Sequence, residues 1–452
     1  MEDEGIAEML TTPESIRTLQ RKLYRKAKQE PTCRFHALYD KIYRADILSH
    51  AYNLVRANKG TAGIDGVTFE AIEAAGEAAV FKAELAEALK RKTYKPAPVR
   101  RVMIPKDQGG YRPLGIPTIR DRVAQMAAKL VIEPIFEADF CDTSYGFRPG
   151  KSAQAAVDDV AHTLNKGYSE VIDADLSKYF DTIPHARLMI MVAERISDGS
   201  VLHLIQMWLK APIIAEGEDG AKRHIGGGKG NRKGTPQGGV ISPLLANIYL
   251  HLLDRIWERR QLQGRLGARI VRYADDIVIL CRRGTEQPMA FLQEILGKMD
   301  LLLNDAKTRV ADANQETFNF LGFEIGIWKS LGTGNRYAHV QPSKKSLQAI
   351  KSRITGMTAR ERTLIPLDYL IREVNGTTLG WVNYFHFRNC SQRMLQVRTH
   401  LEERVRTHLR KRFKIRDRKS GYMHFPRRDL YQRYGLFKVP ATAGWKRADA
   451  LR

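Results

Sequence analysis

The middle of the chain alternates short, continuous apolar runs with longer segments in which apolar residues recur every three or four positions. The runs at 170–175, 270–272 and 277–280 are rich in Val and Ile and predict buried strands, the last two joined as a hairpin. In 122–136 the apolar residues keep helical spacing instead, which predicts a helix with one face on a core. This mixed order indicates an α+β domain with helices against one face of a sheet.

Similar patterns predict elements on both sides of this region. They are a mostly helical start at 1–85 with a glycine-marked loop at 58–66, a basic hairpin of strands at 99–106 and 111–117, and helices at 185–196 and 201–210. Ser242 precedes an apolar helical stripe that has Pro243 in its first turn, so we expect Ser242 to cap that helix. Beyond Gln341 the pattern is helical and basic.

Composition narrows the class of protein. A length of 452 residues corresponds to roughly three domains or subdomains. A hydrophobic content of 43%, a charged content of 27% and a mean hydropathy of -0.38 are typical of a soluble globular protein. No apolar run approaches the roughly 20 residues of a membrane-spanning helix. The acidic start at 1–5 lacks a secretory pattern, so we expect a cytoplasmic location.

The cysteines indicate neither structural zinc nor a disulfide framework. The four of them stand far apart and show no paired spacing, at Cys33, Cys141, Cys281 and Cys390. Free thiols agree with a reducing compartment.

The charge balance indicates a polyanionic partner. Lys and Arg number 74 against 50 Asp and Glu, which gives a formal net charge of +24 and a pI near 9.9. A broad cationic surface suits a long nucleic acid, because phosphate contacts gain affinity by counterion release. A generally cationic surface kept for solubility is the alternative, but basic residues crowd the short stretch 404–419.

Two adjacent carboxylates, Asp275 and Asp276, stand at the tip of the expected hairpin after Tyr273 and Ala274. Like charges this close repel, and hard divalent cations such as Mg²⁺ prefer carboxylate oxygens, so the tip is interpreted as a metal platform. A solvated Asp-Asp turn is the plainer alternative. Asp175 ends another expected strand, and a sheet that pairs the two would gather three carboxylates. Two Mg²⁺ ions about 4 Å apart could then support in-line nucleotidyl transfer.

Spacing leaves two assignments open. Asp173 lies two residues before Asp175 and therefore on the same strand face, which makes it a rival ligand. Phe180 could lie under the sugar of a nucleotide, although a buried aromatic side chain that packs on the sheet is the commoner case.

Three segments in order, 175–181, 234–247 and 273–276, resemble motifs of reverse transcriptases encoded by bacterial group II introns. Further similarities are Arg112 to Pro117, Asn304 with Lys307 and Thr308, and Phe320 to Phe323, and the resemblance extends from the loop at Lys59 to about Val439. It implies an α+β right-hand polymerase with an antiparallel sheet in its fingers and palm, followed by an all-helical thumb or maturase domain. The implied domains are an N-terminal extension with the start of the fingers at 1–85, fingers and palm at 86–326, the thumb or maturase domain at 338–403, and a basic nucleic-acid-binding segment at 404–452.

The resemblance also implies roles for single residues. Asp175, Asp275 and Asp276 would hold two Mg²⁺ ions, with Mn²⁺ as a possible substitute, and are thereby favoured over Asp173. Residues implied at the dNTP are Lys106, Arg112, Phe180 as a steric gate, Gln237 and Lys307. Residues implied at the primer and template are Gly238, Gly239, Phe320, Gly322, Arg410, Lys411 and Arg412. The alternative interpretation is that these basic side chains are solvated surface residues without a ligand. For Lys307 it is an exposed lysine at the end of a helix.

The implied function is RNA-directed DNA synthesis together with help in splicing and mobility of an intron. Its partners would be intron RNA, an RNA template with a DNA primer, target DNA and dNTPs. Gly380 to Phe385, which include Trp381, resemble the maturase region and favour an intron partner, although Trp381 itself suits a helix-bundle core. Many relatives carry a His-Asn-His endonuclease with paired cysteines, and neither feature precedes Arg452, so we expect a form that uses existing DNA ends. The alternatives are an intron-independent reverse transcriptase of a defence or retron-like system, and a non-catalytic RNA-binding splicing factor.

Overall fold

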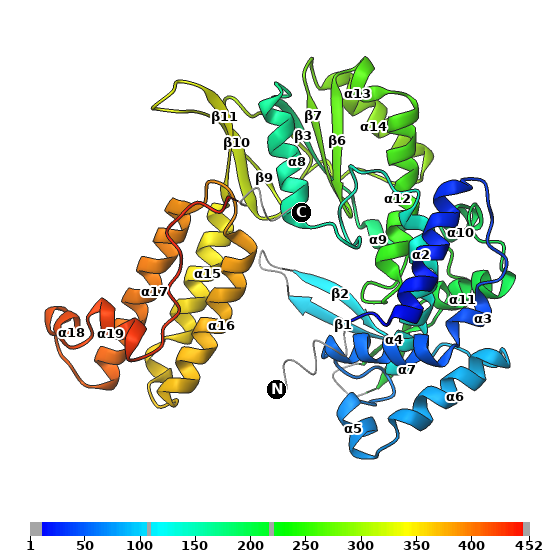
Figure 1. Ribbon diagram of the computed structural model, residues 1–452, viewed down its shortest axis with the longest axis horizontal. Helices are drawn as coiled ribbons and strands as arrows, with labels where there is room; N and C mark the ends of the chain where they lie inside the picture. Colours follow the sequence, from blue (N-terminus) through cyan, green and yellow to red (C-terminus); the bar gives the residue numbers. More distant parts are fainter. Residues whose placement is uncertain (1–10, 106–109, 217–220, 446–452) are drawn as a thin grey trace.

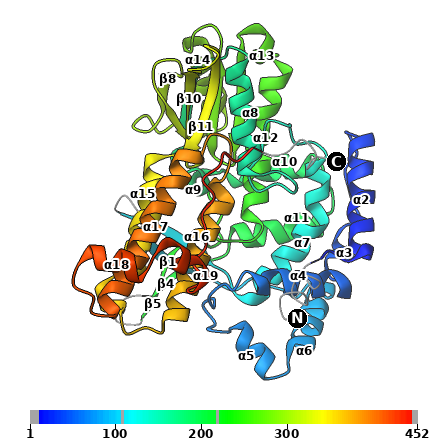
Figure 2. The ribbon, with the colours of Figure 1, turned by 60° about the vertical axis from the view of Figure 1, so that its left-hand side comes forward.

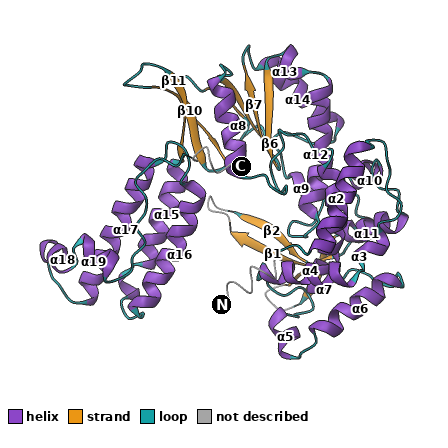
Figure 3. Ribbon diagram, viewed as in Figure 1, coloured by secondary structure: helices purple, strands orange, loops and turns teal. Residues whose placement is uncertain are grey.

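The computed structural model describes residues 11–105, 110–216 and 221–445. Figures 1 and 3 show a helical N-terminal region and a small sheet on one side, a central sheet above them, and a separate helical bundle on the other side. Within the described residues no helix is long and apolar enough to cross a membrane.

The N-terminal region is helical, as expected. Its helices are α2 (Glu14–Gln29), α3 (Tyr39–Ile42), α4 (Ala45–Ala57), α5 (Phe69–Ala74) and α6 (Ala78–Lys90). The first and third of these helices pack on α7 (Ile119–Glu137), whose Thr118 cap accepts a hydrogen bond from the amide of Asp121. The glycine-marked loop falls between α4 and α5, where it was predicted.

The basic hairpin belongs to a four-stranded sheet. Strands β1 (Val99–Pro105) and β2 (Tyr111–Ile116) form the expected antiparallel pair, and β4 (Ile213–Glu216) and β5 (Lys222–Gly226) extend the sheet in the order β2-β1-β4-β5. The pairing of β1 with β4 is parallel and joins segments more than a hundred positions apart in the sequence.

The central sheet is antiparallel and has the strand order β6-β7-β3-β8. Its strands are β3 (Glu170–Asp175), β6 (Ala268–Tyr273), β7 (Asp276–Cys281) and β8 (Arg309–Asp312). Helix α8 (Ala153–Asn165) covers one face, while α12 (Ser242–Arg259) and α14 (Glu286–Lys298) share a core with the other. The short helices α9 (Tyr179–Thr182), α10 (His185–Ala193), α11 (Gly199–Leu209) and α13 (Leu262–Arg265) complete this region.

Two local expectations about this region were wrong. Helices cover both faces of the sheet, since Ile277 and Ile279 lie in one apolar core and Val278 and Leu280 in the other. A continuous apolar run is typical of a strand buried on both sides, which is the physical reason. Ser242 is already the first residue of α12, and its hydroxyl donates to the carbonyl of Pro236 at 2.9 Å instead of capping the helix.

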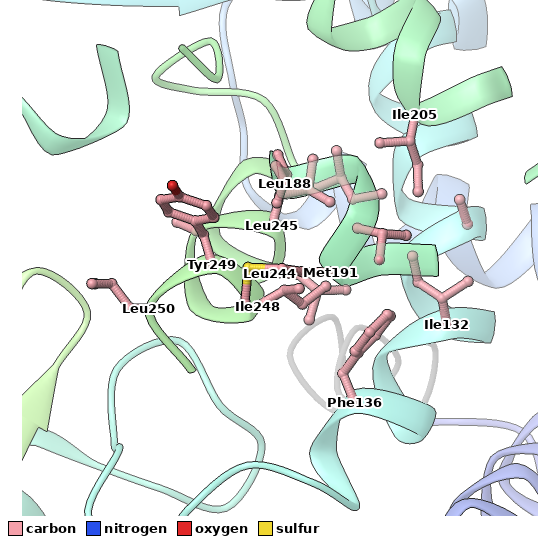
Figure 4. Packing of buried hydrophobic residues seen from close by; sticks show 14 of the residues in the cluster. Ile132, Phe136, Leu188, Met191, Ile205, Leu244, Leu245, Ile248, Tyr249 and Leu250 are labelled. Carbon is pink, nitrogen blue, oxygen red and sulfur yellow. The ribbon is translucent and has the colours of Figure 1, made fainter. Parts of the chain in front are cut away.

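Helices α7, α10, α11 and α12 meet in the larger core, which also contains apolar residues from one face of the central sheet. Figure 4 shows Ile132 and Phe136 of α7 facing the α12 side chains of Leu244 and Ile248, with Met191 of α10 beside them.

A third sheet joins the central region to the helical bundle. It has the order β11-β10-β9, from β9 (Phe318–Phe320), β10 (Phe323–Lys329) and β11 (Arg336–Pro342). The bundle consists of α15 (Lys344–Met357), a short 3-10 turn (Arg360–Arg362), α16 (Leu367–Phe385), α17 (Ser391–Arg412), α18 (Arg418–His424) and α19 (Arg427–Gln432). In Figure 2 the chain after α19 runs back along the bundle toward the sheets.

The boundaries predicted for the domains fall inside continuous elements. The boundary after residue 85 lies in α6, the one at residue 338 lies in β11, and the one after residue 403 divides the 22-residue helix α17. The backbone is therefore regular at each of these three points, and the division into domains stays a prediction.

Candidate active site

The predicted metal platform is the turn between β6 and β7. Tyr273 pairs with Asp276 at the end of the hairpin, and Ala274 and Asp275 form the turn. Ala274 has a φ of 56°, the left-handed region that a residue with a Cβ adopts only at a cost.

Strand register brings the third predicted carboxylate to the same edge. Asp175, the last residue of β3, pairs directly across from Asp276, the first residue of β7. Asp173 pairs with Val278, two positions further from the turn. The structure therefore places Asp175, Asp275 and Asp276 together, with the rival Asp173 on the same strand but farther from the hairpin tip.

A cleft of about 890 Å³ lies beside these residues. Asp173, Asp175 and Asp276 line it from the central sheet. Arg309 lines it from β8 of the same sheet and Lys307 from the turn before β8, while Phe320, Leu321, Gly322, Lys345 and Ser346 line it from the third sheet and the start of the bundle. The cleft thus brings the acidic residues of β3 and β7 next to basic residues of β8, of the turn before it and of α15.

The crowded carboxylates hold their protons more tightly than isolated ones. Desolvation in the cleft, with the charges of Asp275, Asp175 and Asp173, raises the pKa of Asp276 to about 7. Burial and the charge of Asp175 raise the pKa of Asp173 to about 6. Burial also raises the pKa of Asp275, an effect that Arg112 of β2 opposes in part. Such a cluster is stabilised in its ionised form by added positive charge.

The donor chemistry fits a hard divalent cation, although the side chains do not form a closed cage. Carboxylate oxygens on neighbouring strands are the ligands that Mg²⁺ prefers. Among the described residues, however, no group of three or more Asp, Glu, His or Cys side chains converges closely enough to be recognised as a metal site. One carboxylate oxygen of Asp175 instead contacts Lys307 at 3.1 Å and accepts a hydrogen bond from the amide nitrogen of Asn304 at 3.2 Å.

Lys307 therefore lies beside the acidic cluster, and its contact with the departing pyrophosphate stays a prediction. Its side chain is 64% exposed and belongs to a turn between α14 and β8, so the alternative of a helix-end lysine was wrong. The backbone of Asn304 also donates to the carbonyl of Asp175 at 2.8 Å and holds this turn against the end of β3.

Two residues predicted at the dNTP contact each other. The Arg112 Nε donates to the side-chain oxygen of Gln237 at 3.0 Å, which links the basic hairpin to the loop before α12. Lys106 lies outside the described residues. Phe180 is only 8% exposed and packs in the larger core, so at most an edge of its ring reaches solvent.

The glycines of the loop before α12 are required by contacts within the protein. A Cβ on Gly238, whose φ is 112°, would lie 2.3 Å from the carbonyl oxygen of Gly115, and one on Gly239 would lie 2.7 Å from the hydroxyl of Ser242. These contacts account for both glycines without a ligand, so their role at the primer and template stays a prediction.

Phe320 and Gly322 lie where the central region meets the bundle. Phe320 is 4% exposed, and a Cβ on Gly322 would lie 3.2 Å from the ring of Phe385. The hydroxyl of Tyr384 donates to the carbonyl of Leu321 at 3.1 Å. This turn therefore fixes α16 relative to one wall of the cleft.

The basic residues predicted for phosphate contact differ in their contacts within the protein. Arg412 donates to the carbonyls of Thr363 and Ile365 at 2.8 and 2.6 Å, and Arg410 donates to the carbonyl of Arg416 at 3.0 Å. Lys411 is exposed. Both guanidinium groups thus stabilise the bundle, and contact with nucleic acid stays a prediction for all three residues. Trp381 packs partly buried against Phe385, as expected for a bundle residue.

Sequence reasoning missed the residues that surround the hairpin turn. The segment 143–148 runs beside it, with Gly146 against Ala274 and an exposed Phe147 whose ring centre is 6.5 Å from that of Tyr273. Arg272 lies fully buried beneath the turn. The available signals were a charged residue inside an apolar strand and the Gly-Phe-Arg-Pro turn sequence.

Two segments of the chain match known families. Residues 104–325 match the family described as reverse transcriptase (RNA-dependent DNA polymerase), and residues 347–425 match the family described as group II intron, maturase-specific domain. The protein YkfC of Escherichia coli is 35% identical over 349 residues, which are 69% of this chain and 88% of YkfC.

The group II intron-encoded protein LtrA of Lactococcus lactis is 30% identical over 370 residues, which cover 68% of this chain. This chain spans only 59% of the length of LtrA. An uncharacterized 91 kDa protein in the cob intron of Schizosaccharomyces pombe is 26% identical over 425 residues, 77% of this chain and 50% of that protein.

Similarity to solved structures is weaker. Telomerase from Candida albicans in complex with a fragment of telomeric RNA gives a TM-score of 0.40 at 11% identity, over 80% of this chain and 71% of that chain. A partial Cas6-RT-Cas1–Cas2 complex gives a TM-score of 0.33 at 21% identity, over 57% of this chain and 42% of that chain. Scores this low support no argument about the site.

Proposed function

Because this chain belongs to the family of reverse transcriptases and maturases encoded by group II introns, we propose that the edge of its central sheet carries out nucleotidyl transfer with two Mg²⁺ ions. The chain is an RNA-directed DNA polymerase followed by a maturase domain. It has the mixed α+β fold of a polymerase with a helical C-terminal region, and the resemblance found in its sequence is thereby confirmed.

The alignment of Asp175 with Asp276, beside Asp275 in the turn, is the observation that carries this proposal. These three side chains would hold the ions. Mg²⁺ bound there would activate a primer 3′ hydroxyl and stabilise the leaving pyrophosphate. The cluster suits this task because its carboxylates are ionised most readily when a cation neutralises them.

The remaining substrate contacts are proposed for residues around the cleft. Arg112 and Lys106 would bind the triphosphate through charge-assisted hydrogen bonds. Gln237 would lie at the nascent base pair, and the exposed ammonium of Lys307 would meet the departing pyrophosphate. The edge of Phe180 would exclude a 2′ hydroxyl, and this would select dNTPs over ribonucleotides.

The nucleic-acid contacts belong to the same proposal. Gly238, Gly239, Phe320 and Gly322 would border the primer and template. Exposed basic residues of the bundle, such as Lys411, would bind phosphates of intron RNA or target DNA. Through these contacts the protein would assist splicing and mobility of its intron in the cytoplasm.

A primer-extension assay tests the metal assignment. The full chain is supplied with an RNA template, a DNA primer, dNTPs and Mg²⁺. We expect extension by the wild type and by Asp173→Asn, and extension reduced to background by Asp175→Asn and Asp275→Ala, with template–primer affinity unchanged in all four. Normal synthesis by Asp275→Ala would exclude the assignment, and loss in Asp173→Asn alone would move it to the rival residue.

A further inference from the structure

Arg272, the last residue but one of β6, is fully buried and uses every donor of its guanidinium group. Its Nε and Nη2 donate to the carboxylate of Asp254 at 3.0 and 2.6 Å, and Nη2 also donates to the hydroxyl of Ser144 at 2.6 Å. Its Nη1 donates to the side-chain oxygen of Asn247 at 3.1 Å and to the carbonyl of Ala274 at 2.9 Å. The five N–H groups that an arginine carries are all satisfied.

Stability alone does not explain a charged pair at this position. Arg272 and Asp254 are 0% and 1% exposed, whereas the other charged residue of the strand, Arg269, is 26% exposed and pairs with Asp159. Burying two charges costs desolvation that their attraction only about offsets, so apolar residues of similar volume often serve stability equally well. The pair needs another explanation, and its remaining bonds indicate one.

One bond of Arg272 reaches the turn that carries the acidic residues. Its acceptor is the carbonyl of Ala274, the left-handed residue immediately before Asp275. Left-handed backbone at a residue with a Cβ is strained and persists where the surroundings impose it. The bond from Arg272 holds the peptide group in this orientation.

The segment 143–148, which is hydrogen-bonded to Asn247, also packs against the turn. A Cβ on Gly146 would lie 2.2 Å from the backbone nitrogen of Ala274, so the chain at 143–148 packs directly on the turn. The carbonyl of Gly146 accepts a hydrogen bond from Asn247 at 2.7 Å. Asn247 therefore braces both Arg272 and the segment opposite it.

We propose that Arg272, held by Asp254, Asn247 and Ser144, is a positioning residue that fixes the Ala274 peptide and through it the direction of the Asp275 and Asp276 carboxylates. This inference rests on the proposed function of those two residues. Reacting groups must be held closely, because a misplacement of 1 Å can cost about 10²-fold in rate. Arg272 thus acts through the turn and touches no substrate.

Arg272→Lys tests the inference. The variant keeps a positive charge near Asp254 but cannot supply the planar set of donors that reaches Asp254, Asn247 and Ala274 together. We expect the single-turnover rate of dNTP addition to fall at least about tenfold, within the range that misplacement produces. The template–primer dissociation constant should stay unchanged, and more Mg²⁺ should be needed for half-maximal rate.

Arg195→Lys is the matched control. Arg195 is also buried, pairs with Asp139 at 3.0 Å and donates to backbone carbonyls, including that of Ala27 at 2.7 Å. It contacts no residue of the hairpin turn among the contacts of the described residues. Both variants weaken a buried Arg–Asp pair. Their rates of dNTP addition are compared at a temperature below both melting temperatures. If Arg195→Lys slows dNTP addition as much as Arg272→Lys does, the loss is one of general stability and the inference is overturned.

Asn247→Ala provides a second route if Arg272→Lys fails to fold. It removes the brace on Gly146 and one acceptor of Arg272 without leaving a buried charge unpaired. We expect a smaller fall in the rate of dNTP addition with the same rise in the Mg²⁺ requirement. An unchanged rate and Mg²⁺ requirement would overturn the inference. Absence of DNA synthesis by the wild type would instead refute the proposed function, which separates the two failures.

Discussion

Asp175 and Asp173 differ as single residues in what lies across the sheet from them. Asp175 is opposite Asp276, whereas Asp173 is opposite Val278. Alternation along a strand puts both carboxylates on one face, so residue type and spacing could not separate them. The register of β3 with β7 distinguishes them, because it places Asp175 and not Asp173 opposite Asp276 at the hairpin tip.

A substitution at Gly238 is expected to show how tightly the loop before α12 packs. In Gly238→Ala the new Cβ would lie 2.3 Å from the carbonyl oxygen of Gly115, at a φ of 112° that Ala rarely adopts. We expect a loss of more than about 2 kcal/mol, which combines backbone strain with displacement of β2. Thermal melting of the purified chain measures it.

The control for this prediction is Gly150→Ala. Gly150 has a φ of 69°, and nothing lies within 4 Å of an added Cβ. It should therefore show only the conformational cost of about 1 kcal/mol. Equal melting temperatures for the two variants would show that the contact with β2 relaxes at no cost.

At the scale of elements, the hairpin of β6 and β7 was predicted well because its signals are local. Apolar β-branched runs and a short connection specify two strands and a turn. The surroundings of the hairpin were not predicted. Helices α8 and α12 cover opposite faces of its sheet, and this packing joins segments that lie far apart in the sequence. The predicted cap of α12 was wrong because the hydroxyl of Ser242 donates to the carbonyl of Pro236 instead.

The continuity of α17 leads to a prediction about truncation. A chain that ends at residue 403 loses Val405 and Leu409, both 0% exposed, together with Leu436 and Val439 of the returning segment. Each such side chain contributes about 1.5–3 kcal/mol when fully buried. We expect the bundle to melt at a markedly lower temperature and to be cut within α15–α17 by limited proteolysis.

A chain that ends at residue 445 is the control for the truncation. It keeps every bundle element within the residues that the structure describes, so its melting temperature should equal that of the full chain. If the chain ending at residue 403 melts like this control, α17 is not a single structural unit, and the sequence-predicted boundary is correct.

On the scale of the whole molecule, the acidic residues of the candidate active site contrast with the positive charge of the chain as a whole. The acidic cluster lies at the edge of the central sheet, whereas the chain as a whole carries a net charge of +24. Several arginines of the bundle are bound to backbone carbonyls, as Arg412 is. The exposed remainder, including Lys411, supplies the cationic surface that long polyanions favour.

This separation predicts that splicing and DNA synthesis respond differently to one substitution. Asp275→Ala should lose DNA synthesis but keep intron splicing, because help with RNA folding requires binding and not phosphoryl transfer. Splicing of the cognate intron RNA by purified protein, at matched RNA affinity, measures the difference. Loss of splicing with unchanged affinity would contradict the separation of the two tasks.

The sequence by itself determined the strands β1, β2, β3, β6 and β7, the hairpin with its two aspartates, the cationic character and, through three ordered motifs, the family. These features depend on neighbours a few positions apart, so period and composition reveal them. Only the tertiary structure decided which carboxylates face each other and which groups Arg272 contacts. Its partners Asp254 and Ser144 lie 18 and 128 positions away, and such contacts follow from how helices and strands pack, which no local pattern encodes.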